Sequence, residues 1–119
     1  MNILIVDDSK PIRCMLVNVL SSDNHLVTVA CDGKEGAAMA ANFKYDLIIT
    51  DVNMPEMNGF EFAKHLREKT EHKFSPIVFL TTETSDEFRA KGREVGATAW
   101  ITKPFSPHKL LEVVAKVAN

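Results

Sequence analysis

The sequence predicts an α/β domain in which five strands alternate with five helices. Five short apolar runs recur along the 119 residues, and the stretches between them carry apolar residues at helical spacing. Strict alternation of strand and helix favours one parallel sheet with helices on both faces, a doubly wound (βα)5 arrangement. The length is typical of one domain, which we assign to residues 1–119.

The predicted strands are short, apolar and partly β-branched. The first, third and fourth are nearly continuous in apolar residues, which is typical of strands that are buried on both faces of a parallel sheet. In chain order the predicted strands are Ile3–Val6, Leu26–Val29, Leu47–Thr50, Ile77–Leu80 and Ala99–Thr102.

The first three helices are predicted from apolar stripes and from residues that begin helices. Pro11 falls in the first turn of the first helix, where a missing backbone N–H does little harm. Asp32 and Glu35 have the spacing of a capping box, so we expect the second helix to begin there. The stripes of the first and third helices comprise Ile12, Met15, Leu16, Val19, Leu20, Phe62, Ala63 and Leu66.

Similar signals place the last two helices. Thr84 and Glu87 have capping-box spacing, and Gly96 predicts the end of the fourth helix. Ser106 followed by proline is typical of a helix start. The fourth helix has few apolar residues, and its internal Gly92 costs about 1 kcal/mol relative to alanine. We therefore expect this helix to be weakly packed and moveable, although a plain solvated surface helix fits the same pattern.

Composition argues against several classes of protein. The chain is 45% apolar and 25% charged, as ordinary globular domains are. A net charge of -2 gives no basic excess for nucleic acid, so we expect no direct DNA binding. No apolar run approaches the roughly 20 residues that span a bilayer, and we recognise no signal peptide. We therefore expect no membrane insertion and a cytoplasmic location.

Cysteine and histidine show no metal-binding pattern. Cys14 and Cys31 belong to no CxxC motif or Cys/His cluster, and we expect both to be small buried side chains without a disulfide. None of the histidines has ligand spacing, and we expect all of them at the surface, without a phosphoryl group. They are His25, His65, His72 and His108.

Reactive side chains follow four of the five predicted strands. Asp7 and Asp8 follow the first, Asp51 the third, Thr81 the fourth and Lys103 the fifth. Ligands of parallel sheets bind at the carboxyl ends of the strands. Three carboxylates there repel one another by on the order of 1–4 kcal/mol per pair, which a hard cation such as Mg²⁺ offsets. One such Asp is commonly just a helix cap, but the joint pattern favours a site where Asp51 accepts a phosphoryl group.

The same residues resemble the response regulator receiver domain of two-component systems. The resemblance runs the length of the chain and includes the segment DVNMPEMNG at Asp51–Gly59 and the triplet Lys103-Pro104-Phe105. Among receivers it is greatest to single-domain chemotaxis regulators of the CheY type. It implies a flavodoxin-like sheet of order 2-1-3-4-5 and a cis peptide bond before Pro104.

The resemblance also implies a Mg²⁺ site. Asp8 and Asp51 would ligate the ion directly, together with the backbone carbonyl of Asn53. Asp7 would act largely through water. Carboxylate and carbonyl oxygens are the ligands that suit this ion.

Further roles follow from the resemblance for the phosphoryl group itself. Asp51 would be the phosphoacceptor, and Thr81 and Lys103 would bind the phosphoryl oxygens. Asn53 and Glu83 occupy positions that tune how long the acyl phosphate lasts. Both match the chemotaxis type, so we expect a short-lived signal.

Trp100 stands where the chemotaxis type usually has tyrosine. In the family this aromatic residue turns inward when the hydroxyl at the Thr81 position is drawn to the phosphoryl group. The bland alternative is a half-exposed packing residue with no switching role. We expect the fourth helix, fifth strand and fifth helix to form the surface that contacts a partner.

The implied partners are proteins. The phosphodonor would be a histidine kinase, or a small donor such as acetyl phosphate, and the target a protein such as the flagellar motor or a phosphotransfer protein. We expect a monomer that hydrolyses its own phosphoryl group and turns over no external substrate. A phosphorelay intermediate or phosphate sink fits nearly as well. A Mg²⁺-dependent phosphatase with an aspartyl intermediate fits poorly, because it needs an acid where Asn53 stands.

Overall fold

A computed structural model describes residues 1–118, and over that range it shows one parallel sheet of five strands in the order β2-β1-β3-β4-β5. Each strand lies within one residue of its predicted bounds. The strands are β1 (Asn2–Val6), β2 (Leu26–Ala30), β3 (Leu47–Asp51), β4 (Ile77–Thr81) and β5 (Ala99–Thr102). The predicted doubly wound, flavodoxin-like fold is confirmed.

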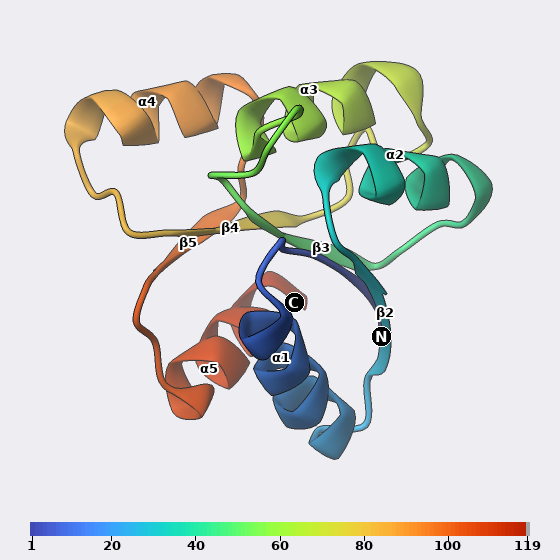
Figure 1. Ribbon diagram of the computed structural model, residues 1–119, viewed down its shortest axis with the longest axis vertical. Coiled ribbons are helices and arrows are strands. Elements are labelled where there is room, and N and C mark those ends of the chain that lie inside the picture. Colours follow the sequence, from blue (N-terminus) through green and yellow to red (C-terminus); the bar gives the residue numbers. More distant parts are fainter. Residues whose placement is uncertain (119) are drawn as a thin grey trace.

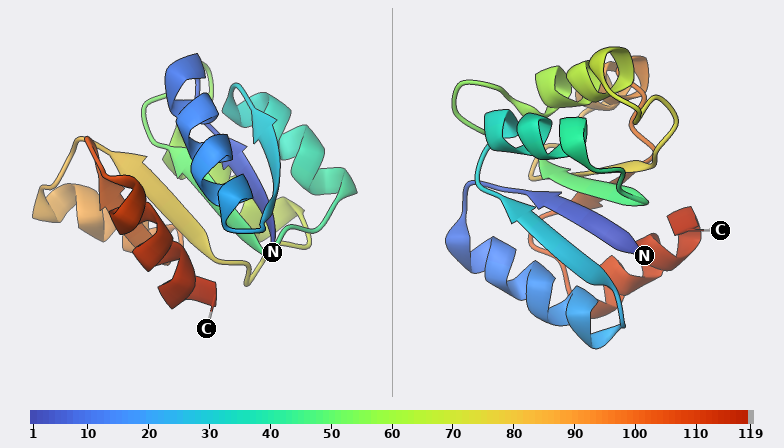
Figure 2. Two further views of the ribbon diagram at one scale, coloured as in Figure 1. Left: turned by 90° about the horizontal axis from the view of Figure 1, so that it is seen from below. Right: turned by 90° about the vertical axis from the view of Figure 1, so that its right-hand side faces the viewer.

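The helices cover both faces of the sheet. They are α1 (Lys10–Ser22), α2 (Gly33–Asn42), α3 (Gly59–Lys69), α4 (Asp86–Glu94) and α5 (Pro107–Ala118). In Figure 1, α2, α3 and α4 lie above the sheet, and α1 and α5 lie below it. The right-hand view of Figure 2 shows the sheet between these two layers. None of the described helices has the length and apolar character that a membrane span requires.

Burial follows the predicted pattern in the central strands. Every residue of β3 and β4 is buried, as is β1 after its first residue. Phe62, Ala63 and Leu66 fill one face of the sheet with no exposed surface. The edge strand β2 is largely exposed, and Leu26 at its start is 73% exposed. The core therefore lies against β1, β3 and β4, whose carboxyl ends it holds in place.

The helix starts agree with prediction except at α4. The Asp32 carboxylate accepts the Glu35 N–H at 2.8 Å, as the predicted cap requires. The predicted capping box of Thr84 and Glu87 is wrong. The hydroxyl of Ser85 instead accepts the Phe88 N–H at 3.2 Å, so α4 begins one residue later than that box implied.

The C-terminal end of α4 and the start of α5 agree with the sequence signals. Gly96 lies just beyond α4 with φ of 86°, a left-handed conformation that glycine adopts without steric cost. At the start of α5 the Ser106 hydroxyl accepts the Lys109 N–H at 3.1 Å. Both residues were predicted to mark helix ends.

Two predictions of exposure are wrong. The cysteines were expected to be buried, and His72 was expected to lie at the surface. Cys14 and Cys31 are both exposed, because α1 turns one outward and the other follows the exposed edge strand β2. His72 has no exposed surface. Its Nε2 accepts the Tyr45 N–H at 3.0 Å, and its Nδ1 lies 3.1 Å from the Thr70 hydroxyl oxygen. His72 is buried because it satisfies a backbone donor from another part of the chain.

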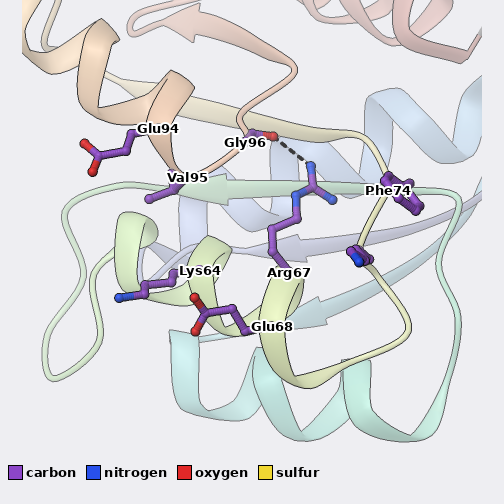
Figure 3. A pocket seen from close by; sticks show the side chains of 8 residues that line it. Lys64, Arg67, Glu68, Phe74, Glu94, Val95 and Gly96 are labelled. Atoms are coloured by element: carbon purple, nitrogen blue, oxygen red, sulfur yellow. Dashed lines mark hydrogen bonds between the residues drawn. The ribbon is translucent and has the colours of Figure 1, made fainter.

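Arg67 joins two loops at the end of the sheet opposite the predicted site. Its Nη1 donates to the carbonyls of His72 at 2.7 Å and Ser75 at 2.6 Å, and its Nη2 donates to that of Gly96 at 2.7 Å. Figure 3 shows the guanidinium reaching Gly96 beside a cavity of about 420 Å³. Arg67 therefore ties the segment before β4 to the turn after α4.

Candidate functional site

Three carboxylates meet at the carboxyl end of the sheet. Asp7 and Asp8 follow β1, and Asp51 ends β3, which pairs directly with β1. One oxygen from each of the three lies within 4.8 Å of the others. Asp7 and Asp51 are buried and Asp8 is exposed. The predicted acid cluster is therefore present, with one member open to solvent.

Lys103 brings a positive charge to the same place. Its Nζ lies 3.2 Å from Oδ1 of Asp51 and 3.4 Å from Oδ2 of Asp7. The peptide bond between Lys103 and Pro104 is cis, as the resemblance implied. The ammonium, 19% exposed, offsets part of the repulsion between the two buried carboxylates.

Asp7 accepts hydrogen bonds at both carboxylate oxygens and at its backbone carbonyl. Its Oδ1 accepts the Ser9 N–H at 2.8 Å, and its Oδ2 faces Lys103. Its backbone carbonyl accepts Nη1 of Arg13 at 2.7 Å. Both carboxylate oxygens are therefore already engaged by donors of the chain itself. Sequence reasoning missed Arg13, because spacing along the chain does not show how the turn after β1 is oriented.

The surroundings of Asp51 make its ionisation unfavourable. Burial raises the pKa of this carboxyl above its usual 3.8, and the nearby Asp7 raises the pKa further. Lys103 and the Val52 N–H, which donates to Oδ1 at 2.9 Å, act in the opposite direction without cancelling the rise. A hard divalent cation would complete the compensation, so this set of oxygen donors fits Mg²⁺.

The remaining predicted residues follow or end the neighbouring strands at the same edge of the sheet. Thr81 ends β4, next to β3, and its buried hydroxyl accepts the Glu83 N–H at 2.9 Å. Asn53 and Glu83 both line a cavity of about 290 Å³ at the start of α4. The structure therefore places these two residues on the wall of one hollow.

Trp100 lies farther from the acids, beneath α4. Its ring centroid is 5.2 Å from that of Phe79 and 5.4 Å from that of Phe88. The residue is partly buried, as both the switching role and the alternative of a half-exposed packing residue allow. Trp100 pairs with Phe79 in the sheet, and Phe79 is two residues before Thr81 on β4.

Several known proteins are similar to this chain in sequence. Residues 3–115 match the response regulator receiver domain. The chain is 39% identical over 115 residues to the transcriptional regulatory protein ResD of Bacillus subtilis and 40% identical to SrrA of Staphylococcus aureus. Each alignment covers 97% of this chain and 45% of the relative, so the chain spans about half the length of these curated relatives.

A solved structure is similar along nearly all of both chains. The chemotaxis protein CheY4 of Vibrio cholerae is 47% identical, with a TM-score of 0.94 over 98% of this chain and 97% of that one. The family match extends over most of the sequence, and it includes the acids, the hydroxyl and the ammonium that meet at the sheet edge. This chain belongs to the response regulator receiver domain family.

Proposed function

We propose that this chain is a response regulator that accepts a phosphoryl group on Asp51. The observation that carries the proposal is the meeting of three carboxylates and the Lys103 ammonium at one sheet edge. Receiver domains are phosphoryl-accepting signalling domains rather than enzymes with an external substrate. The donor is a histidine kinase or a small acyl phosphate.

The transfer is a displacement at phosphorus. A carboxylate oxygen of Asp51 forms the new P–O bond while the bond from phosphorus to the donor's leaving atom breaks, and the leaving group keeps that electron pair. Asp8, Asp51 and the carbonyl of Asn53 would hold Mg²⁺, with Asp7 acting through water. The ion would supply positive charge that neutralises the acids and the incoming oxygens.

Lys103 and Thr81 receive the transferred group. The Lys103 ammonium already lies between two carboxylates and can follow the negative charge outward to a phosphoryl oxygen. The Thr81 hydroxyl donates to another. The added charge of about -1.5 to -2 gives both groups a strong new acceptor. Asn53 and Glu83, which line one cavity and lie two residues beyond Asp51 and Thr81, tune hydrolysis of the acyl phosphate.

The signal then reaches a protein target through α4, β5 and α5. Movement of Thr81 toward the phosphoryl group alters the packing beside Trp100, which lies beneath α4. Similarity to CheY4 across 97% of that chain supports a chemotaxis-type role. ResD and SrrA, which are transcriptional regulatory proteins, are covered over only 45% of their length. We infer a cytoplasmic monomer, and the net charge of -2 gives this domain no basic surface excess for binding DNA.

Intact-mass measurement with acetyl phosphate and Mg²⁺ tests the proposal. The native chain should gain one phosphoryl group, and Asp51→Asn should gain none. Asp23→Asn, an exposed acid outside the cluster, is the matched control and should be phosphorylated like the native chain. Phosphorylation of Asp51→Asn, or none of the native chain, would contradict the proposal.

A second measurement separates the signalling roles. A chemotaxis-type regulator loses its phosphoryl group by hydrolysis within a short time. A phosphorelay intermediate instead passes it from Asp51 to a histidine phosphotransfer domain. Following the fate of the phosphoryl group with and without such a domain distinguishes the two. A phosphoryl lifetime of many hours in Mg²⁺ would argue against the chemotaxis role.

A further inference from the structure

Four aromatic side chains form a closed cycle beneath α4. In the described part of the chain, Phe60 contacts Phe79 and Phe88, and Trp100 also contacts both, with centroid distances from 4.9 to 5.5 Å. The rings come from α3, β4, α4 and β5 in turn. Three of the four pairs are edge-to-face, a preferred geometry for aromatic contacts. The cycle therefore links four elements through side chains of fixed shape.

Gly92 completes the enclosure of the indole. It is the buried residue of α4, and a Cβ built on it would overlap Cζ2 and Cη2 of Trp100. The benzo ring of Trp100 thus occupies the space that any other side chain at residue 92 would fill. The other apolar side chains between α4 and the sheet are few, namely the partly buried Phe88 and Val95.

We propose that the Gly92–Trp100 contact is the joint through which β5 fixes the position of α4. Turning the indole breaks its contacts with Gly92, Phe79 and Phe88, so its orientation is tied to the position of α4. Conversely, α4 cannot approach the sheet more closely while the indole fills this space. Helix and indole therefore move together, and the missing Cβ at residue 92 permits their close approach.

The contact with Trp100 gives Gly92 the opposite effect on stability from the one that its place inside a helix predicts. A glycine inside a helix normally lowers stability, and replacing it with alanine normally raises it. If the joint exists, alanine must displace either the indole or the helix, so the same replacement lowers stability. The two readings predict changes of opposite sign for one substitution.

The test uses Gly92→Ala in the full chain, with Ala90→Gly on the exposed side of α4 as the control. Trp100 is the single tryptophan, so emission and iodide quenching report on the joint alone. Gly92→Ala should red-shift the emission, increase quenching and lower Tm by about 5 °C or more. Ala90→Gly should lower Tm while leaving emission unchanged. Unchanged emission with a Tm raised by about 4 °C in Gly92→Ala would overturn the inference.

A second pair of variants distinguishes a clash with the indole from a general loss of stability. Trp100→Phe removes the ring atoms that a Cβ at residue 92 would meet. In that background Gly92→Ala should lower Tm much less than it does in the native chain, or raise it. An equal loss of Tm in both backgrounds would show that Gly92 does not act through the indole.

A last measurement relates the joint to signalling, and this step alone rests on the proposed function. With acetyl phosphate and Mg²⁺, the native emission should change as Asp51 is phosphorylated, whereas Gly92→Ala should take up the same phosphoryl group with little change in emission. An equal emission response in both would overturn the coupling. If neither takes up a phosphoryl group by mass, the proposed function fails, while the fluorescence and Tm comparisons still decide the joint.

Discussion

Lys103 and Asp51 form an ion pair with Nζ 3.2 Å from Oδ1, although they follow strands that are not neighbours in the sheet. Lys103 reaches across the end of β4 from β5 to do so. The ammonium also contacts Asp7, so one cation is shared by two buried carboxylates. The pairing therefore couples the charge of β5 to the acids of β1 and β3.

Replacing Lys103 should slow phosphorylation without abolishing metal binding. Lys103→Met removes the charge that would meet the transferred phosphoryl group, so the rate of mass gain with acetyl phosphate should fall by about 100-fold. Binding of Mg²⁺ should persist, because the three acids remain. Lys109→Met, on the exposed surface of α5, serves as the control. A native rate in Lys103→Met would remove Lys103 from the reaction.

Replacing Asp51 with asparagine should stabilise the fold and greatly weaken its response to Mg²⁺. The pKa of Asp51 in the folded chain lies above 3.8, so the folded chain binds the proton more readily than the unfolded chain. Stability therefore falls as pH rises from 3.8 through the folded-state pKa, and the ionised carboxylate destabilises the fold at neutral pH. Thermal unfolding in EDTA should therefore give a higher Tm for Asp51→Asn. Magnesium at 100 times its Kd should stabilise the native chain by about 2.7 kcal/mol and the variant far less. A large Mg²⁺ response in the variant would place the ion elsewhere.

The buried His72 should make stability depend on pH near neutrality. Burial lowers its folded-state pKa below 6.5, with a smaller effect from Lys44, so the unfolded chain binds the proton more readily. Stability is therefore full above about pH 6.5 and falls as pH decreases through that value. Urea unfolding at about pH 7.5 and about pH 5.5 measures the difference. His72→Gln should reduce it, whereas the exposed His108→Gln should leave it unchanged.

Loss of the Arg67 side chain should destabilise the domain substantially. Arg67→Ala leaves the carbonyls of His72, Ser75 and Gly96 without their shared donor, and about 2–4 kcal/mol of unfolding free energy should be lost in urea titrations. Arg67→Lys should retain only part of the stability, because an ammonium lacks the planar fork that spans the carbonyls. Lys64→Ala, from the same cavity wall, tests whether lost charge alone explains the change.

Much of the fold could be predicted because burial on both faces leaves a continuous apolar run. This held for β1, β3 and β4, whose ends then placed Asp7, Asp8 and Asp51 together. The order of the strands was implied by the family resemblance, whereas the shared edge of their carboxyl ends follows from parallel pairing in any order. The meeting of these three carboxylates could therefore be predicted from their positions at the strand ends.

The remaining features depend on contacts between distant residues. His72 is buried because the Tyr45 N–H, 27 positions away, needs an acceptor. Gly92 looked like a weakness of α4, but its missing side chain makes room for Trp100. Cys14 and Cys31 are exposed because of the direction in which α1 and the strand β2 present them. Spacing along one segment reveals none of these partners.

The hydrogen bond between Lys103 and Asp7 joins residues 96 positions apart. During synthesis the acids of β1 leave the ribosome long before the ammonium that accompanies them. A nascent or truncated chain that ends before β5 can hold most of the sheet and still lack the charge balance of the finished centre. Under the proposed function, full reactivity of Asp51 therefore has to wait until translation has passed Lys103, and a chain cut before that residue should accept phosphoryl groups far more slowly.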